Sequence, residues 1–429
     1  MRNCDSEHVV RAAARGPFNC NHTIVKTRAT LRLAIWIGIV GISPQIVMGL
    51  YALGGPAFQA TFHLPYDLMG LLGPASVFGY GIAALVGGAL LDRVRVAPLA
   101  RVVLLLAMGA CIVGGVTPWW VLLAVTMVVF GESSGILNIL PMVFFSDLYP
   151  EDRTRTMARW QLVVSIASVI MPLIIGVLLG AAASHFGEQH GWRVILLGCA
   201  PVFIILLALM PRQHLGRRTG VEPFRLKQVI PLVRSPMFVS ILILGVLHTA
   251  ADNSAYFWII LMVKQRFHVS PEMTGVLASA PGVAYVSGRF LRSTLRWPLG
   301  PLPNIALGSL VGAIVLLAAV RAPTFPAVVV LYGAAALFIS LNWPSTLGFA
   351  GDRFPTQTGT VLGAVNAVSG PGTALVSIVM GIVSNASSVS TGMLIPPAMF
   401  FTLSVFAWIT HLRARRLGEP TATAAAPGS

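Results

Sequence analysis

The sequence predicts an all-α membrane protein with twelve transmembrane helices arranged in two pseudo-symmetric six-helix halves. Three observations support this prediction: long apolar stretches recur along the chain, positive charges gather in every second gap between them, and the second half repeats motifs of the first. Of the 429 residues, 56% are hydrophobic and 10% are charged, with a formal net charge of +15. A nucleic-acid-binding protein would carry such a charge on one face of a soluble domain. Outside the apolar stretches, almost no residues remain to form a soluble domain.

The apolar stretches have the length of membrane-spanning helices. A hydrocarbon core about 30 Å thick needs about 20 predominantly apolar residues per helix. Alternation with a period of two residues is absent, which excludes a transmembrane β-barrel. Proline and glycine occur inside several stretches, as membrane helices tolerate. The predicted spans are 31–57, 67–91, 98–117, 119–145, 158–182, 193–210, 236–263, 271–295, 301–320, 326–349, 359–384 and 391–411.

Lysines and arginines predict the orientation. With both termini in the cytoplasm, 24 of the 29 fall in inner segments or at the inner ends of spans, Arg289 within the eighth span is counted with neither side, and four are counted outside, namely Arg193, Lys264, Arg266 and Arg321. Cytoplasmic loops of membrane proteins are enriched in these residues. The sequence therefore predicts an even number of spans and a multi-pass protein of the cytoplasmic membrane with both termini inside.

The segments outside the spans set the expected domain boundaries. We expect a cytoplasmic N-terminal arm over 1–30, halves over 31–210 and 236–412, a cytoplasmic central loop over 211–235, and a disordered tail over 413–429. The arm has no early apolar core, so a secretory signal peptide is not expected. The four cysteines lack the paired spacing of metal sites, and we expect neither a metal nor a cofactor.

Two motifs occur once in each half. The segment GALLDR at 88–93, followed by Pro-Leu at 98–99, corresponds to GRFLRS at 288–293, followed by Pro-Leu at 298–299. The segment DLYP at 147–150 corresponds to DRFP at 352–355, at an offset of 205 residues. Both pairs match the second and fourth inner loops of one six-helix unit with those of another.

This organisation resembles the major facilitator superfamily. Its G-x-L-x-D-R signature after the second span is matched by Gly88, Leu90, Asp92 and Arg93, and its acidic and basic cluster after the fourth span is matched loosely. A Gly-Trp-Arg start to the sixth span is present at 191–193. The resemblance covers nearly the whole chain outside the arm and tail. It implies a secondary transporter that works by alternating access, and we expect a monomer.

The resemblance also implies a gating latch at the cytoplasmic ends of the helices. Asp92 lies among arginines, where a carboxylate accepts charge-assisted hydrogen bonds and faces the positive N-terminus of a neighbouring helix. In the family that neighbour is the eleventh span. The alternative is that these charges only direct membrane insertion, and in the second half Arg292 replaces the acid. The latch candidates are Gly88, Asp92, Arg93, Arg95, Asp147, Arg153 and Gly359.

Charged groups inside spans are costly, at least about 2.5 kcal/mol each, and usually face a cavity or a partner. Glu132 lies in the middle of the fourth span and is the proton-coupling candidate. The alternative is a carboxylate that is permanently paired with an arginine or histidine. Arg289 lies near a cytoplasmic helix end, so its side chain is expected to extend to the membrane surface.

His248, Asp252 and Tyr256 share one face of the seventh span at i, i+4 spacing. In the family fold, the first, fourth, seventh and tenth spans line a central cavity. The alternatives are a structural His–Asp contact and, for the amides, hydrogen bonds between helices. The substrate-path candidates are Gln45, His248, Asp252, Tyr256, Asn342, Trp343 and Asn366.

The predicted function is proton-coupled symport of a small polar metabolite, with the solute, the proton and the lipid bilayer as partners. One alternative is a proton-coupled drug or metabolite efflux antiporter, although only Pro172 and Gly176 remain of the glycine-rich run typical of such antiporters. Another is a membrane sensor that has the fold without transport. Intramembrane enzyme motifs such as His-Glu-x-x-His are absent, so an enzyme is not expected.

Overall fold

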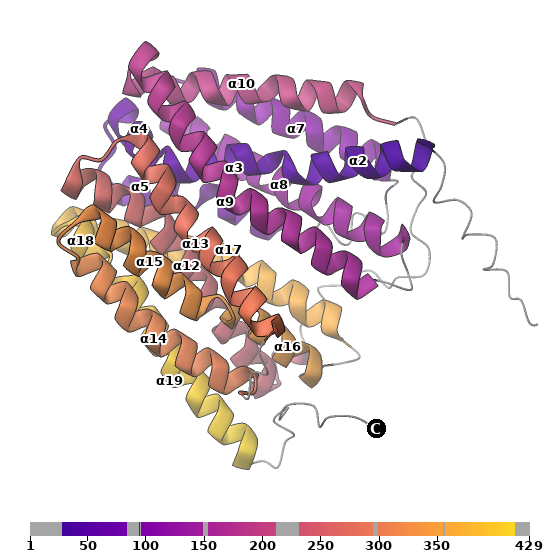
Figure 1. The fold of residues 1–429 in the computed structure, drawn as a ribbon, viewed down its shortest axis with the longest axis vertical. Helices are drawn as coiled ribbons and strands as arrows, with labels where there is room; N and C mark the ends of the chain where they lie inside the picture. The colour runs from indigo at the N-terminus through magenta and orange to yellow at the C-terminus, as the bar shows by residue number, and fades with distance from the viewer. Residues whose placement is uncertain are drawn as a thin grey trace, which may run out of the picture.

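A computed structural model describes residues 28–83, 94, 96–148, 153–211, 231–294, 299–354 and 357–416. All regular secondary structure in these ranges is helical. The helices form two bundles, one coloured indigo to magenta and the other orange to yellow (Figure 1). Most of the predicted arm, most of the central loop and most of the tail lie outside the described residues.

The first predicted span is broken into three helices, α2 (Arg28–Ile42), α3 (Pro44–Leu53) and α4 (Gly55–Phe62). Proline lacks the backbone N–H that continues a helix, and a proline lies at each break. The rest of this half consists of α5 (Tyr66–Leu72), a helical stretch over 75–83, α7 (Val96–Val116), α8 (Trp120–Leu148), α9 (Arg153–Phe186) and α10 (Glu188–Ala208).

The second half begins with α12 (Pro236–Phe267), whose first turn is capped by the Ser235 hydroxyl. The tenth predicted span is broken into α15 (Phe325–Ile339) and α16 (Asn342–Arg353). The other helices are α13 (Pro271–Thr294), α14 (Pro301–Arg321), α17 (Thr358–Ala386), α18 (Val389–Gly392) and α19 (Ile395–Arg416).

Ten segments of the described chain are long and apolar enough to cross a membrane. They correspond to ten of the twelve predicted spans. The second predicted span runs into residues 84–91, outside the described part, and the eighth is helical as α13 but is not among the ten. Several helices extend beyond their apolar stretch, because α9 and α10 begin with polar residues that the prediction left outside the spans.

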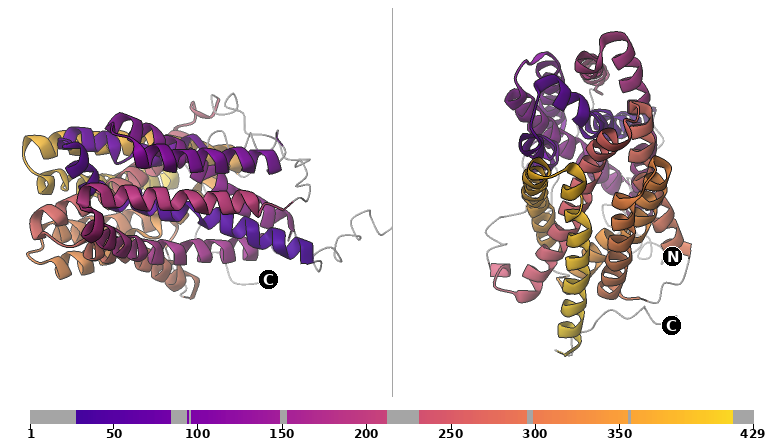
Figure 2. Two further views of the ribbon diagram at one scale, coloured as in Figure 1. Left: turned by 90° about the horizontal axis from the view of Figure 1, so that it is seen from above. Right: turned by 90° about the vertical axis from the view of Figure 1, so that its left-hand side faces the viewer.

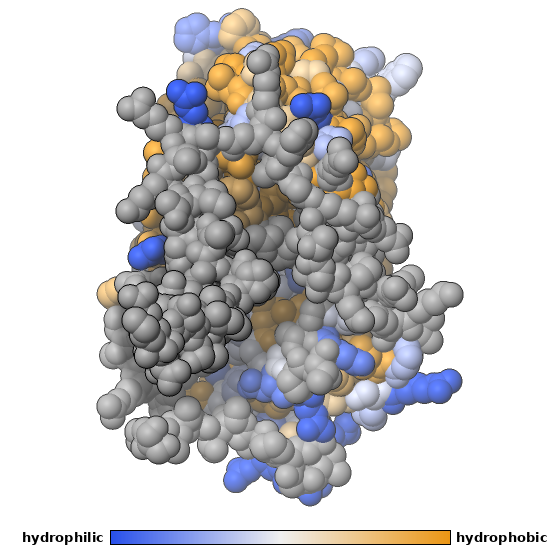
Figure 3. All heavy atoms as spheres, turned by 90° about the vertical axis from the view of Figure 1, so that its right-hand side faces the viewer, coloured by the Kyte–Doolittle hydropathy of each residue, from blue (hydrophilic) through white to orange (hydrophobic). Residues whose placement is uncertain are grey.

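The two halves meet along two pairs of helices. In one pair α5 contacts α17, and in the other α9 contacts α13. The halves approach each other at the end that holds α4, α5 and α18, which we call the closed end, and diverge toward α16 (Figures 1 and 2). On the opposite end, hydrophilic side chains gather in the lower part of the view, whereas the upper part is largely hydrophobic with a few hydrophilic groups (Figure 3). The outer surface exposes large apolar side chains such as Val330 and Leu375, as expected for helices that face lipid.

Candidate functional site

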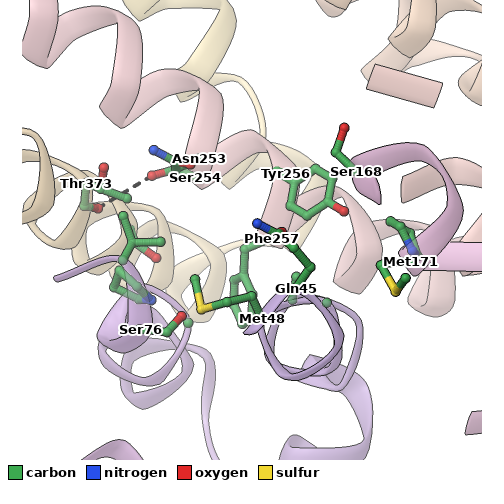
Figure 4. A pocket seen from close by; sticks show the side chains of 17 residues that line it. Gln45, Met48, Ser76, Ser168, Met171, Asn253, Ser254, Tyr256, Phe257 and Thr373 are labelled. Atoms are coloured by element: carbon green, nitrogen blue, oxygen red, sulfur yellow. Dashed lines mark hydrogen bonds between the residues drawn. The ribbon is translucent and has the colours of Figure 1, made fainter. Parts of the chain in front are cut away.

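A cavity of about 190 Å³ lies between the two halves, walled by α3, the segment after α5, α9, α12 and α17 (Figure 4). Among the residues that the structure describes, none that lines it is charged. Methionine, proline and phenylalanine side chains make up much of the wall. Its polar members are Gln45, Ser76, Ser168, Asn253, Ser254, Tyr256, Thr373 and Ser377.

Several of these polar groups are already hydrogen-bonded within the protein. The Ser168 hydroxyl donates to the Ser165 carbonyl at 2.7 Å, and Trp258 Nε1 donates to Ser377 Oγ at 2.9 Å. Asn253 uses its Nδ2 on the Thr249 carbonyl at 2.9 Å, which leaves its Oδ1 as an acceptor.

Two further groups are available to a ligand. Within the described part of the chain, neither the Gln45 amide nor the Tyr256 hydroxyl has a hydrogen-bond partner. These two side chains come from different halves and both line the cavity (Figure 4). Together with Asn253 Oδ1, they offer donors and acceptors without a net charge.

A carboxylate lies directly behind this wall. Asp252 precedes the cavity residue Asn253 on α12, and the Tyr285 hydroxyl on α13 lies 2.6 Å from each of its oxygens. Tyr256 and Tyr332 lie within electrostatic range of the same carboxylate. Phenol groups from three helices therefore lie near Asp252, and that of Tyr285 is in direct contact with it.

The cavity wall follows the internal repeat. The offset of 205 residues that relates the motifs at 147–150 and 352–355 also relates Ser168 on α9 to Thr373 on α17, and both residues line the cavity. The two halves thus present an equivalent position to one shared space.

The sequence model described as Major Facilitator Superfamily matches residues 35–301, more than half of the chain. The chain belongs to the major facilitator superfamily. It is 21% identical over 343 residues to an uncharacterized MFS-type transporter of Bacillus subtilis, which covers 76% of this chain and 82% of that protein.

Solved structures of transporters share the fold. A bacterial homologue of the human lysosomal transporter Spinster, in an inward-facing and occupied conformation, superposes with a TM-score of 0.73 at 15% identity, covering 90% of this chain and 98% of that one. A D-xylose–proton symporter superposes with a TM-score of 0.66 at 15% identity, covering 89% of this chain and 97% of that one. The protein is thus a multi-pass membrane protein with the fold of secondary transporters.

The substrate-path candidates of this superfamily member lie in different surroundings. Gln45 and Tyr256 line the cavity, whereas His248 is 5% exposed and stacks on Trp343, with ring centroids 6.1 Å apart. Phe400 covers another side of the same imidazole at 6.2 Å. The structure therefore places His248 and Trp343 inside the second half, although His248 shares a helical face with Tyr256.

The two asparagine candidates make hydrogen bonds within the protein. Asn342 is fully buried, and its Nδ2 donates to Ser309 Oγ at 2.9 Å, which joins α16 to α14. Asn366 Nδ2 donates to the Leu362 carbonyl at 2.8 Å within α17. Neither side chain lines the cavity.

Glu132 is half-buried on α8 and does not line the cavity. Its carboxylate has no hydrogen bond or ion pair with the described residues, so the alternative of a permanently paired carboxylate finds no partner there. The backbone of α8 at Glu132 packs closely against the helical stretch 75–83 of the same half. A Cβ on Gly79 would lie 2.9 Å from the Glu132 nitrogen.

Four latch candidates, Gly88, Asp92, Arg93 and Arg95, lie outside the described residues. The other three belong to helix ends: Asp147 lies in the last turn of α8, and Arg153 and Gly359 lie in the first turns of α9 and α17. The latch stays a prediction.

Arg289 is an exposed residue of α13, and the extension of its side chain to the membrane surface stays a prediction. Its guanidinium donates to Ser165 Oγ at 3.0 Å and so joins α13 to α9 of the other half. Sequence reasoning also missed Asn253, Tyr285 and Tyr332. Asn253 adjoins the selected Asp252, but a tyrosine in an apolar span looks like any core aromatic until its hydroxyl partner is known.

Proposed function

We propose that this protein is a secondary transporter that carries a small uncharged polar solute across the bacterial cytoplasmic membrane in symport with protons. The cavity between the halves carries the proposal, because its wall offers amide and hydroxyl groups but no charge. A charged solute would lose its hydration there without a counter-charge. An uncharged solute regains hydrogen bonds from Gln45, Asn253 and Tyr256.

Proton coupling is supported by two acids on described helices, neither of which lines the cavity. Glu132 lies in the first half and Asp252 in the second. Intramembrane carboxylates are costly and mark ion pathways. A protein with a similar fold, a D-xylose–proton symporter, likewise transports a neutral solute together with a proton.

Alternating access is supported by the unequal ends of the molecule. At the closed end, Lys264 pairs with Glu188 of the other half at 2.9 Å, and the Tyr66 and Trp258 rings lie 6.4 Å apart across the halves. The Phe257 ring fills the space beside Gly55, whose added Cβ would lie 3.1 Å from it. With both termini in the cytoplasm, the closed end faces outward and the structure is inward-open.

Solute uptake by reconstituted protein tests the proposal. Proteoliposomes with an alkaline interior are incubated with labelled uncharged sugars and nucleosides and, in parallel, with anionic and cationic solutes of equal size. We expect accumulation of an uncharged solute that stops when a protonophore collapses the gradient. Accumulation only with an acidic interior would instead indicate an antiporter, and uptake of no solute would favour a sensor.

Variants of the cavity amides connect uptake to the site. Gln45→Ala and Asn253→Ala each remove one side-chain amide, so we expect weaker uptake of the same solute with a raised KM. Gln161→Ala is the matched control, because this exposed glutamine of α9 does not line the cavity. Equal uptake by all three variants would contradict the assigned site.

A further inference from the structure

The Asp252 carboxylate and the Tyr285 hydroxyl form a half-buried polar pair that transport of a neutral solute does not itself use. The hydroxyl lies 2.6 Å from each carboxylate oxygen, within the range of a strong charge-assisted hydrogen bond. One hydroxyl has a single proton to donate, so this pair leaves the second oxygen without a donor from Tyr285. In the described part of the chain, no ion pair neutralises Asp252.

The charged and titratable groups around Asp252 come from three helices. His248 lies one turn earlier on α12, enclosed by Trp343 and Phe400. Tyr256 lies one turn later, Tyr332 is contributed by α15, and Arg289 lies one turn beyond Tyr285 on α13. Arg289 directs its guanidinium to Ser165 of the other half. The pair thus has one direct donor, the phenol of Tyr285.

One cavity side chain, Tyr256, lies near this carboxylate in the chain. Tyr256 lines the cavity and lies one helical turn from Asp252 on the same face of α12. Its hydroxyl has no hydrogen-bond partner among the described residues. A phenol can both accept and donate a proton-bearing hydrogen bond, so Tyr256 can pass a proton from cavity water toward Asp252.

The other member of the pair lies on the helix that contacts the opposite half. On α13, a Cβ added to Gly282 would lie 2.9 Å from the Ser168 carbonyl of α9. One turn past Tyr285, Arg289 bonds to Ser165 of α9. Tyr285 therefore lies between two points at which α13 contacts the other half, and its bond to Asp252 fixes α13 to α12 at that level.

We propose that the Asp252–Tyr285 pair is the proton-binding site that couples this transporter to the proton gradient. In the charged form, Asp252 holds Tyr285 through a charge-assisted hydrogen bond. A proton from cavity water then binds a carboxylate oxygen and weakens that bond, which frees α13 to move against α9. Release of the proton restores the bond. This inference rests on the proposed proton coupling and assigns it to the second half in place of Glu132.

The test follows conformation against pH and needs no substrate. Spin labels replace Gln189 and Gln265, which are exposed at the closed end of different halves, in a protein without native cysteines. Pulsed electron resonance measures the distance between the labels in phosphatidylethanolamine–phosphatidylglycerol nanodiscs from acidic to alkaline pH. We expect two distance populations in the parent protein whose ratio titrates with pH.

Substitutions of the pair then identify the titrating group. Asp252→Asn imitates the protonated acid, so we expect a distance distribution that no longer responds to pH. Tyr285→Phe keeps the acid and removes its donor, so we expect the midpoint to move upward by about one to two pH units. Asp67→Asn and Tyr80→Phe are matched controls at residues that do not line the cavity, and we expect the parent titration from both.

The outcomes separate this inference from the proposed function. If the parent protein shows no titration, the proposed proton coupling fails together with the inference. If the parent titrates and Asp252→Asn titrates identically, the inference alone is overturned. Loss of the titration in Glu132→Gln but not in Asp252→Asn would move the proton site to the first half. If Asp252→Asn does not fold, an unshifted midpoint in Tyr285→Phe overturns the proposal.

Discussion

Gly70 and Gly381 pack backbone to backbone across the two halves of the protein: a Cβ built on Gly381 would lie 3.2 Å from the Gly70 Cα. The same contact recurs between Gly275 and Gly176, where a Cβ on Gly176 would lie 2.9 Å from the Gly275 Cα. An offset of 205 residues relates Gly70 to Gly275 and also Gly176 to Gly381. The internal repeat thus places one glycine pair on each side of the interface.

A bulkier side chain at one of these glycines should destabilise the contact between the halves at the closed end. Gly176→Val introduces atoms where the α13 backbone already lies, and such overpacking costs about 1–3 kcal/mol. We expect a lower population of the present conformation, measured as a longer distance between labels at Gln189 and Gln265. Gly198→Val is the control, because a Cβ there meets nothing within 4 Å. An equal effect of both substitutions would mean that valine acts on the helix and not on the contact.

The ion pair at the closed end is expected to contribute modestly. Lys264 and Glu188 are 31% and 56% exposed, and pairs of this kind are worth about 0.2–1 kcal/mol. Position 57 lines a small cavity beside the pair, so a cysteine introduced there reports on opening of this end. Lys264→Gln should therefore raise the alkylation rate of that cysteine by at most about fivefold.

Salt and charge reversal are the controls for this prediction. High salt should raise the alkylation rate of the parent and leave the Lys264→Gln protein almost unchanged, since screening weakens a pair that the variant lacks. The double reversal Lys264→Glu with Glu188→Lys should restore the parent rate. A rate that salt does not change would show that packing alone closes this end.

The predicted topology can be tested by reporter fusions. Because the lysines and arginines gather in alternate loops, fusions after Pro150 and after Leu215 should report cytoplasm, whereas fusions after Pro65 and after Glu188 should report the outside. Two reversed reporters among the four would refute the twelve-span topology with cytoplasmic termini.

The predicted latch is tested at Asp92. Asp92→Asn removes the charge while nearly preserving the volume, so we expect a protein that inserts normally, transports slowly and rests more often inward-facing. Cysteine accessibility from the two sides of the membrane measures the resting state. Unchanged transport together with unchanged accessibility would leave Asp92 with a role in insertion alone.

Much of the fold was predictable because membrane insertion depends on composition and length. Continuous apolar stretches identified ten spans that the structure also has, and the motif 88–93 with the repeat identified the superfamily. The breaks in the first and tenth spans were not predicted. Pro44 lies at the first break, but proline also occurs inside unbroken helices such as α9, where Pro172 interrupts nothing.

The site was less predictable, and His248 and Tyr256 show why. Their spacing on α12 places them on one face, yet Tyr256 lines the cavity, whereas His248 stacks on Trp343 and meets Phe400 edge-on. In a membrane protein, lipid-facing and core-facing surfaces are both apolar, so helical periodicity does not show which neighbour a face meets. The sequence by itself determined the membrane fold, its repeat and its family. Only tertiary packing decided which polar groups share the cavity, because α3, α9, α12 and α17 bring together residues more than 300 positions apart.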